Sequence, residues 1–95
     1  MIRYDIQATK QYKKDVRRLH RAGFDLHKLE SVIDLLASGR RLPHTLNDHP
    51  LKGRMKDSRE CHIAPDWLLR YMIDGERLIL ILVSTGDHRR VLGRE

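Results

Sequence analysis

The chain is 95 residues long, 40% of them hydrophobic and 34% charged, which predicts one small folded domain over residues 1–95. No apolar run approaches the roughly 20 residues of a membrane-spanning helix and no signal-peptide pattern is present, so we exclude membrane and disordered classes. Nineteen Lys and Arg against thirteen Asp and Glu give a net charge of +6, which favours a polyanionic partner such as a nucleic acid or an acidic protein.

The N-terminal part predicts a short strand followed by two helices. Residues 3–8 alternate apolar and polar side chains, a pattern typical of an edge strand. Thr9 and Asp25 are residue types that cap helices, and Gly23 and Gly39 are suited to ending them, so we expect helices between these pairs. Apolar residues at helical spacing support both helices: Tyr12, Val16 and Leu19 in the first, and Leu26, Leu29, Val32, Ile33 and Leu36 in the second.

The C-terminal part predicts an antiparallel meander after a long loop. Residues 40–57 are rich in turn formers, so we expect a loop there, with a short strand near residues 54–56. Strands are predicted at 59–64, 67–73 and 78–83, the last being apolar on both faces and therefore central. Alternation in the first of these places Glu60, His62 and Ala64 on one face, and Arg59, Cys61 and Ile63 on the other. We therefore predict an α+β domain with two N-terminal helices on one face of a small, mainly antiparallel four-stranded sheet.

Three short motifs lie in this second half: DHPLKG at 48–53, ECHIAPDW at 60–67 and TGDH at 85–88. In this order they resemble the YafQ-like branch of the RelE/ParE toxin superfamily. The resemblance implies a single RelE-like domain over residues 1–95 and the toxin component of a type II toxin–antitoxin system. It also implies a ribosome-dependent mRNA endonuclease, whose partners would be a cognate antitoxin and the ribosome with its mRNA.

The same motifs imply the catalytic residues, which are His49, His62, Asp66 and His88. RNA carries its own nucleophile, the 2′-hydroxyl, so cleavage needs a base, an acid and positive charge near the phosphate. Histidine suits proton transfer because its unperturbed pKa is about 6.5. Our hypothesis makes His88 the general acid and His62 and Asp66 candidates for accepting or relaying the 2′ proton, while His49 orients the substrate or shares that task.

Positive charge near the phosphate would come from basic residues of the same region. The predicted RNA-binding residues are Lys52, Arg59, Arg70, Arg89 and Arg90. Three histidines and an aspartate could instead bind zinc, but no closely spaced histidine pair is present, so we expect neither metal nor cofactor. The predicted cleavage is therefore independent of metal ions.

Two positions depart from the pattern of the resembling toxins. Relatives often carry an arginine before the Thr-Gly pair and an aromatic residue after the last histidine, where this chain has Ser84 and Leu92. Both changes bear on holding RNA, so we predict a nuclease with attenuated activity. The alternative is a catalytically inactive or ParE-like toxin that acts by binding a protein target such as a DNA topoisomerase.

The first helix carries a basic stripe on the face opposite its apolar residues. The stripe comprises Lys13, Lys14, Arg17 and Arg18, and it is either a solvated helix face or a contact for RNA phosphate or an acidic antitoxin. The one cysteine, Cys61, cannot form an internal disulfide. We therefore expect a cytoplasmic protein with no membrane partner.

Overall fold

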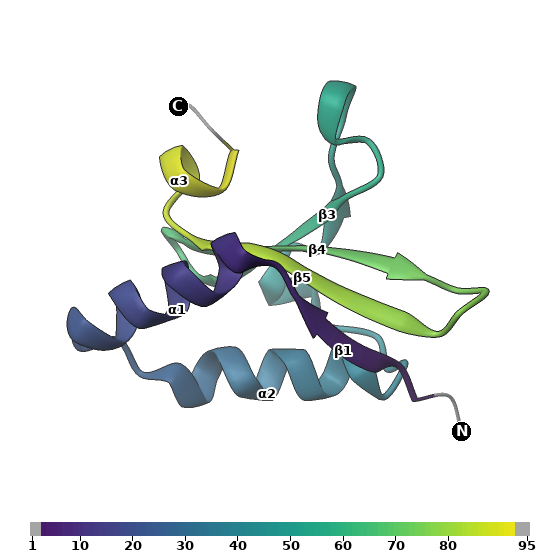
Figure 1. The fold of residues 1–95 in the computed structure, drawn as a ribbon, viewed down its shortest axis with the longest axis horizontal. Helices are drawn as coiled ribbons and strands as arrows, with labels where there is room; N and C mark the ends of the chain where they lie inside the picture. The colour runs from purple at the N-terminus through teal and green to yellow at the C-terminus, as the bar shows by residue number, and fades with distance from the viewer. Residues whose placement is uncertain (1–2, 93–95) are drawn as a thin grey trace.

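A mixed five-stranded sheet in the order β1-β5-β4-β3-β2 organises the computed structural model, which describes residues 3–92. The strands are β1 (Asp5–Ala8), β2 (His49–Pro50), β3 (Arg59–Ala64), β4 (Trp67–Asp74) and β5 (Ile79–Gly86), and the helices are α1 (Lys10–Arg21), α2 (Leu26–Ala37) and α3 (His88–Leu92), with 3-10 turns η1 (His44–Leu46) and η2 (Gly53–Met55). Only β1 and β5 pair in parallel. Helices α1 and α2 lie on one side of the sheet, whereas α3 and the η2 loop rise from the other (Figure 1).

Local sequence signals account for both long helices. The Thr9 hydroxyl accepts the backbone N–H of Tyr12 in the first turn of α1 and donates to the Val83 carbonyl at 2.6 Å, which ties the start of the helix to β5. The Asp25 carboxylate caps α2 by accepting the backbone N–H of His27. Gly23 and Gly39 follow the helices with φ of 86° and 74°, a region that glycine enters at little cost. The predicted caps and helix ends are thus confirmed.

The hydrophobic core fills the space between the sheet and the two long helices. Its buried members are Tyr12, Leu19, Leu29, Val32, Ile33, Leu36, Ala37, Leu42, Cys61, Ile63, Trp67, Leu69, Tyr71, Leu80 and Leu82. Burial raises the pKa of the Cys61 thiol to about 12, so this cysteine stays protonated and behaves as a small apolar residue. None of the helices formed by residues 3–92 is long and apolar enough to cross a membrane.

The sheet differs from the sequence prediction in three details. It has five strands instead of four, because His49–Pro50 pairs with β3. Residues 53–55 form η2, so the strand predicted near 54–56 is wrong; Gly53, with φ of 67°, favours a turn there. β5 is an interior strand between β1 and β4, as its apolar faces suggested, but the middle position belongs to β4.

Two irregularities in the ladder decide which side chains face α3. Tyr71 pairs with Leu82, but the preceding residue, Arg70, pairs with Ser84, so one extra residue is inserted in β5. Leu82 therefore faces the core, while Ser84 lies beside Arg70 on the opposite face. A second shift after His62 turns Ala64 toward the core, which corrects its predicted place on the His62 face.

Candidate active site

Asp66 and His88 form a directly bonded pair at one end of the sheet. Asp66 lies in the turn between β3 and β4, and His88 is the first residue of α3. The Nδ1 atom of His88 lies 2.9 Å from Oδ1 of Asp66. The hydrogen bond from His88 lowers the pKa of the Asp66 carboxyl, so the carboxylate accepts and Nδ1 donates. This arrangement leaves Nε2 of His88 for a substrate.

The pair makes a prediction that NMR can check. Replacing His88 with Ala should raise the pKa of the Asp66 carboxyl toward its ordinary value, because the hydrogen bond that is the largest cause of its depression is removed. A titration of the side-chain carboxyl carbons by ¹³C NMR measures this change. An Asp66 pKa that is equal in the parent and the variant would show that the two side chains do not interact in solution.

His62 lies between this pair and a second cluster built around Glu60. The ring centroids of His62 and His88 are 5.8 Å apart and meet edge to face. Oε2 of Glu60 lies 3.1 Å from Nε2 of His49 and 3.8 Å from Nε2 of His62. All four predicted catalytic residues therefore gather on one side of the sheet, and Glu60, a carboxylate that sequence reasoning missed, lies between His49 and His62.

Glu60 has the surroundings of a functional group. It is only 4% exposed, and within residues 3–92 its second oxygen, Oε1, is buried without a hydrogen-bond partner. Nδ1 of His49 donates to the Asn47 carbonyl at 2.7 Å, because a carbonyl can only accept, and Nε2 of the same ring faces Oε2 of Glu60 at 3.1 Å. An imidazole beside a buried carboxylate is an arrangement typical of acid–base sites. The signal in the sequence was a glutamate two residues before a histidine on one strand, which places both on one face.

A groove of about 380 Å³ runs over this face of the sheet between η2 and α3. Its lining includes Met55 from η2, Arg70 and Ser84 from the strands, and Arg90 from α3. Arg70 is held in place because its Nε donates to the Ser58 hydroxyl at 3.0 Å. No other residue among 3–92 bonds the remaining nitrogens of that guanidinium, which can therefore bind an anion in the groove.

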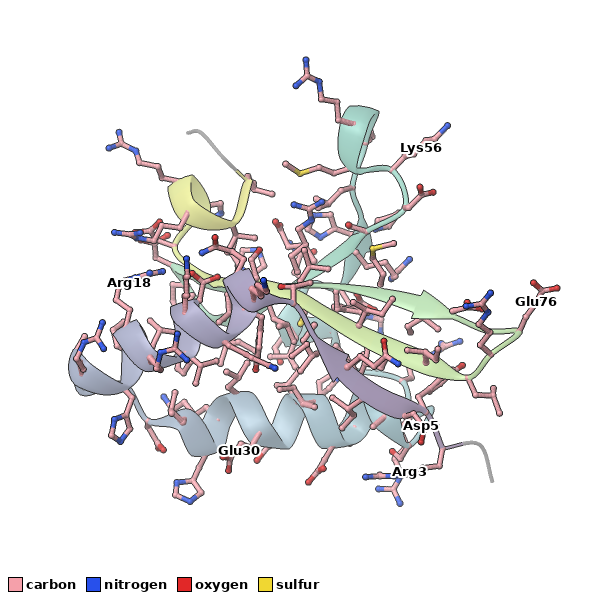
Figure 2. All side chains as sticks on the ribbon, viewed as in Figure 1. Arg3, Asp5, Arg18, Glu30, Lys56 and Glu76 are labelled. Atoms are coloured by element: carbon pink, nitrogen blue, oxygen red, sulfur yellow. The ribbon has the colours of Figure 1, made fainter. Side chains whose placement is uncertain are left out.

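The structure brings most of the predicted RNA-binding residues to this side. Arg70 and Arg90 line the groove, Arg89 is exposed on α3, and Lys52 is exposed directly before η2. Figure 2 shows Lys56 at the outer end of the same loop, so the η2 segment is basic along its length. Arg59 is the exception, because strand alternation turns it to the opposite face of β3.

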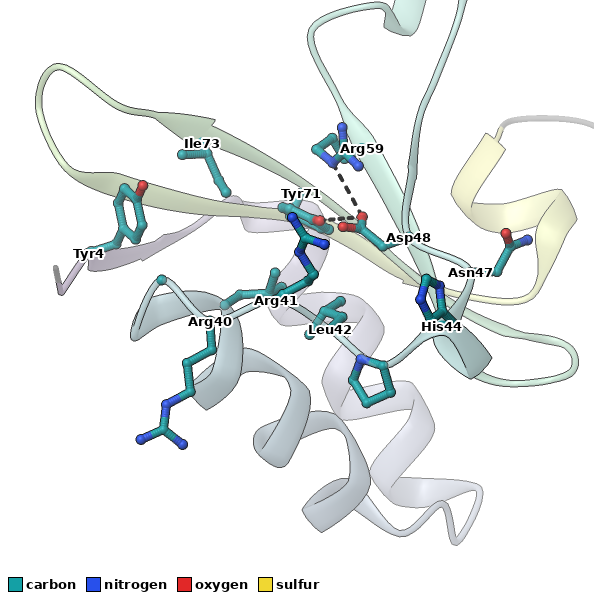
Figure 3. A pocket seen from close by; sticks show the side chains of 13 residues that line it. Tyr4, Arg40, Arg41, Leu42, His44, Asn47, Asp48, Arg59, Tyr71 and Ile73 are labelled. Atoms are coloured by element: carbon teal, nitrogen blue, oxygen red, sulfur yellow. Dashed lines mark hydrogen bonds and ion pairs between the residues drawn. The ribbon is translucent and has the colours of Figure 1, made fainter. Parts of the chain in front are cut away.

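Arg59 belongs instead to a network that fixes the loop before His49. Its Nε lies 3.3 Å from Oδ1 of Asp48, and the same oxygen accepts a hydrogen bond from the Tyr71 hydroxyl (Figure 3). Burial, and then the bond to Asp48, raise the pKa of Tyr71, so its hydroxyl remains a donor. Asp48 thus anchors its motif to the sheet, and the adjacent cavity of about 430 Å³ is lined by His44 but by none of His49, His62 and His88.

Metal binding has no evident centre in the part of the chain that is described. Among residues 3–92, no group of three or more His, Cys, Asp or Glu side chains is arranged to hold a metal ion. His49, Glu60 and His62 come nearest in composition, with Nε2 of each histidine facing Oε2 of Glu60 at 3.1 and 3.8 Å. The cluster as it stands is two imidazoles around one carboxylate.

Known proteins resemble the chain over almost its whole length. Residues 4–93 match the family model described as a bacterial toxin of type II toxin–antitoxin systems, YafQ. The chain is 36% identical over 94 residues to the mRNA interferase toxin YafQ of Escherichia coli strain K12, an alignment that covers 98% of this chain and 100% of that protein.

Solved structures agree with the sequence comparisons. The toxin in the E. coli DinJ-YafQ toxin-antitoxin complex superposes with a TM-score of 0.87 at 35% identity, covering 97% of this chain and 100% of that chain. A metal-bound toxin from Helicobacter pylori also gives a TM-score of 0.87, at 42% identity, covering 93% of this chain and 98% of that chain. Fold and sequence therefore point to the same relatives.

Proposed function

The chain belongs to the YafQ family of bacterial toxins of type II toxin–antitoxin systems, and we propose that it is an mRNA interferase that cleaves mRNA on the ribosome by acid–base catalysis. The observation that carries the proposal is the array in which Asp66 holds His88 beside His62 and Glu60 connects His62 to His49. Two imidazoles, each backed by a carboxylate and flanked by a cationic groove, fit the transfer of two protons around one phosphate.

The proposed reaction uses the RNA's own hydroxyl as nucleophile. His62 accepts the 2′-hydroxyl proton while the 2′-oxygen attacks phosphorus and the bond to the 5′-oxygen breaks. His88, oriented through Nδ1 by Asp66, gives a proton from Nε2 to the departing 5′-oxygen. The products are a 2′,3′-cyclic phosphate and a 5′-hydroxyl, so atoms and charges balance without water or metal.

The surrounding residues position these two imidazoles and offset the charge of the phosphate. The Glu60 carboxylate lies 3.8 Å from Nε2 of His62 and 3.1 Å from Nε2 of His49, so its negative charge stabilises the positive charge that His62 gains when it takes the 2′ proton. The guanidinium of Arg70 lies in the groove and offsets the negative charge that develops on the phosphorane. Arg90 faces it from α3 and binds the same or an adjacent phosphate.

Membership of a type II toxin family implies a cognate antitoxin as partner, and the ribosome with its mRNA is the proposed target. The basic stripe on α1 offers one contact surface for either partner. Lys13, Lys14 and Arg17 are exposed, whereas Arg18 turns back to a buried carboxylate. An acidic or phosphate-bearing partner would therefore meet three of the four cations first.

Cleavage mapping during translation tests the proposed function. A reporter mRNA is translated in a cell-free extract with the toxin, and cut sites are located by primer extension. We expect cuts within the translated reading frame and none in a matched mRNA that cannot initiate translation. An intact mRNA in a growth-arresting concentration of toxin would contradict the proposal and favour a protein target such as a topoisomerase.

Metal content provides an independent prediction. Protein stripped with EDTA and then freed of the chelator should cleave at the parent rate in a buffer whose only divalent ion is the Mg²⁺ that ribosomes need. The expected reason is that proton transfer by His62 and His88 requires no Lewis acid. This experiment is needed because the similar toxin from Helicobacter pylori has been solved with a bound metal. Loss of activity on stripping, with recovery on adding Zn²⁺ or Cu²⁺, would refute metal independence.

A further inference from the structure

A second cavity, of about 250 Å³, adjoins the Asp66–His88 pair between α1 and the start of α3. Leu19, Ala22 and Phe24 give it apolar walls. The volume is below the roughly 300–1,000 Å³ of pockets that take drug-sized ligands, which suits a single base. Because Asp66 lines this cavity and also holds His88, a ligand bound here would lie beside the reacting groups.

A buried network presents the side chain of Arg18 to the cavity. Asp15 is 1% exposed, and its Oδ1 accepts from Nη2 of Arg18 at 2.8 Å and from Gln11 at 2.9 Å. Its Oδ2 accepts the backbone N–H of Thr85 at 3.1 Å, so one carboxylate joins α1 to the end of β5. The guanidinium is thereby fixed close to Gly86, and Figure 2 shows Arg18 between α1 and α3.

Gly86 keeps this corner open to a ligand. Its φ of 144° is one that other residues rarely adopt. A Cβ at this position would lie 3.8 Å from Nη2 of Arg18 and 3.7 Å from Cβ of Arg90, so a longer side chain would fill the space between the two arginines. The glycine of the TGDH motif thus leaves room between two cations next to His88.

Phe24 supplies an aromatic surface at the same place. Its ring meets Trp67 edge to face, with centroids 5.0 Å apart and planes at 85°, yet the residue remains 41% exposed. Trp67 is itself fixed, because its Nε1 donates to the Thr85 hydroxyl at 3.0 Å. The Phe24 ring is therefore fixed by its contact with Trp67 while part of its surface stays exposed, which suits it to stacking on a nucleobase.

We infer that this cavity is a nucleotide subsite beside the reacting phosphate, in which Phe24 stacks on a base and Arg18 binds a phosphate of the RNA chain. The inference rests on the proposed RNA cleavage and identifies further substrate-binding residues for it. The two carboxylates of the lining are already engaged: Asp66 bonds His88, and Asp87 accepts the backbone N–H of Arg90 at 3.0 Å. Their remaining oxygens can accept N–H groups from a base edge.

Direct RNA binding tests the inference without requiring cleavage. The probe is a fluorescent eight-nucleotide RNA with 2′-O-methyl sugars, which cannot supply the nucleophile, and binding is followed by anisotropy at several salt concentrations. Phe24→Ala should weaken binding about ten-fold while Phe24→Tyr preserves it. Arg18→Gln should lower the slope of log affinity against log salt by about 0.7, the value for one phosphate contact on a single strand. Leu78→Ala and Arg21→Gln, at exposed positions outside the cavity, are the matched controls.

Arg18 also contacts a buried carboxylate, so thermal unfolding of each variant is measured in parallel, and Arg18→Lys, which keeps the charge, should retain the parent salt slope. Parent-like affinity in Phe24→Ala together with a parent-like salt slope in Arg18→Gln would overturn the subsite, even if the parent cleaves mRNA. If these variants lose RNA binding while the parent leaves translated mRNA intact, the subsite stands and the proposed cleavage fails. The two claims are thereby separated.

Discussion

Replacing His88 with Ala should reduce mRNA cleavage by about 10²–10⁴-fold, the range that a positioned proton donor contributes. The structure gives the reason, since Asp66 binds Nδ1 of His88 and leaves Nε2, on the other side of the ring, for the substrate. The loss should lie in the maximal single-turnover rate, with little change in RNA affinity. Growth arrest on expression should disappear with the activity.

The chain provides a matched control for this variant at the start of α2. His27 also lies near a carboxylate, with Nδ1 3.3 Å from Oδ1 of Asp25, but it is far more exposed and lies away from the groove. His27→Ala should cleave and arrest growth like the parent. Both variants should unfold at the parent temperature within a few degrees, because neither side chain is in the core. A His88→Ala protein that remains as toxic as the parent would remove His88 from the general-acid role.

Glu60→Gln should have the second largest effect, a loss of about ten-fold or more in the cleavage rate. The substitution keeps the shape of the side chain but removes the negative charge that lies near Nε2 of both His49 and His62. A neutral amide cannot stabilise the positive charge that His62 gains when it takes the 2′ proton. The loss should therefore lie in the maximal single-turnover rate, with an RNA affinity near that of the parent, a split that a purely structural role would not produce.

Glu76 in the hairpin between β4 and β5 supplies the control for Glu60. It is exposed at the far end of the sheet (Figure 2), so Glu76→Gln makes the same chemical change away from the histidines. We expect it to leave the rate unchanged, and we expect Glu60→Asp to recover part of the lost rate. A parent-like single-turnover rate in Glu60→Gln would mean that the carboxylate only fills space.

Much of the fold follows from local signals in the sequence. Both long helices begin after a capping residue, Thr9 or Asp25, and end before a glycine, Gly23 or Gly39, as predicted. These signals are readable in the sequence because a cap and a left-handed glycine each involve only the residues of one helical turn. The family resemblance rested on short motifs in a fixed order, and the match over residues 4–93 confirms it. The two-residue strand β2 was not predicted, since a pairing so short has no pattern of its own and depends on the strand it meets.

The site residues that sequence reasoning missed are those placed by tertiary contacts. Glu60 is a site residue because register puts it opposite His49, which no local pattern shows. In the sequence, Arg59 and Arg70 are both cations near the ECHIAPDW motif. Strand alternation turns Arg59 to the face that carries Asp48, whereas Arg70 lies on the opposite face and lines the groove. Ser84 reaches the groove only through the extra residue in β5, which a strict alternation of the strand would exclude.

The role of the RNA's own 2′-hydroxyl is tested most directly by a single-atom change in the substrate. An mRNA is prepared with one 2′-deoxy nucleotide on the 5′ side of a mapped cut, and an otherwise identical all-ribose mRNA serves as the reference. Both are presented to the toxin on translating ribosomes, and the ends of the products are analysed. We predict that the cut at the deoxy position disappears while neighbouring cuts persist, and that the all-ribose product ends in a 2′,3′-cyclic phosphate. Cleavage that continues at the deoxy position would contradict a mechanism in which the histidines activate the 2′-hydroxyl.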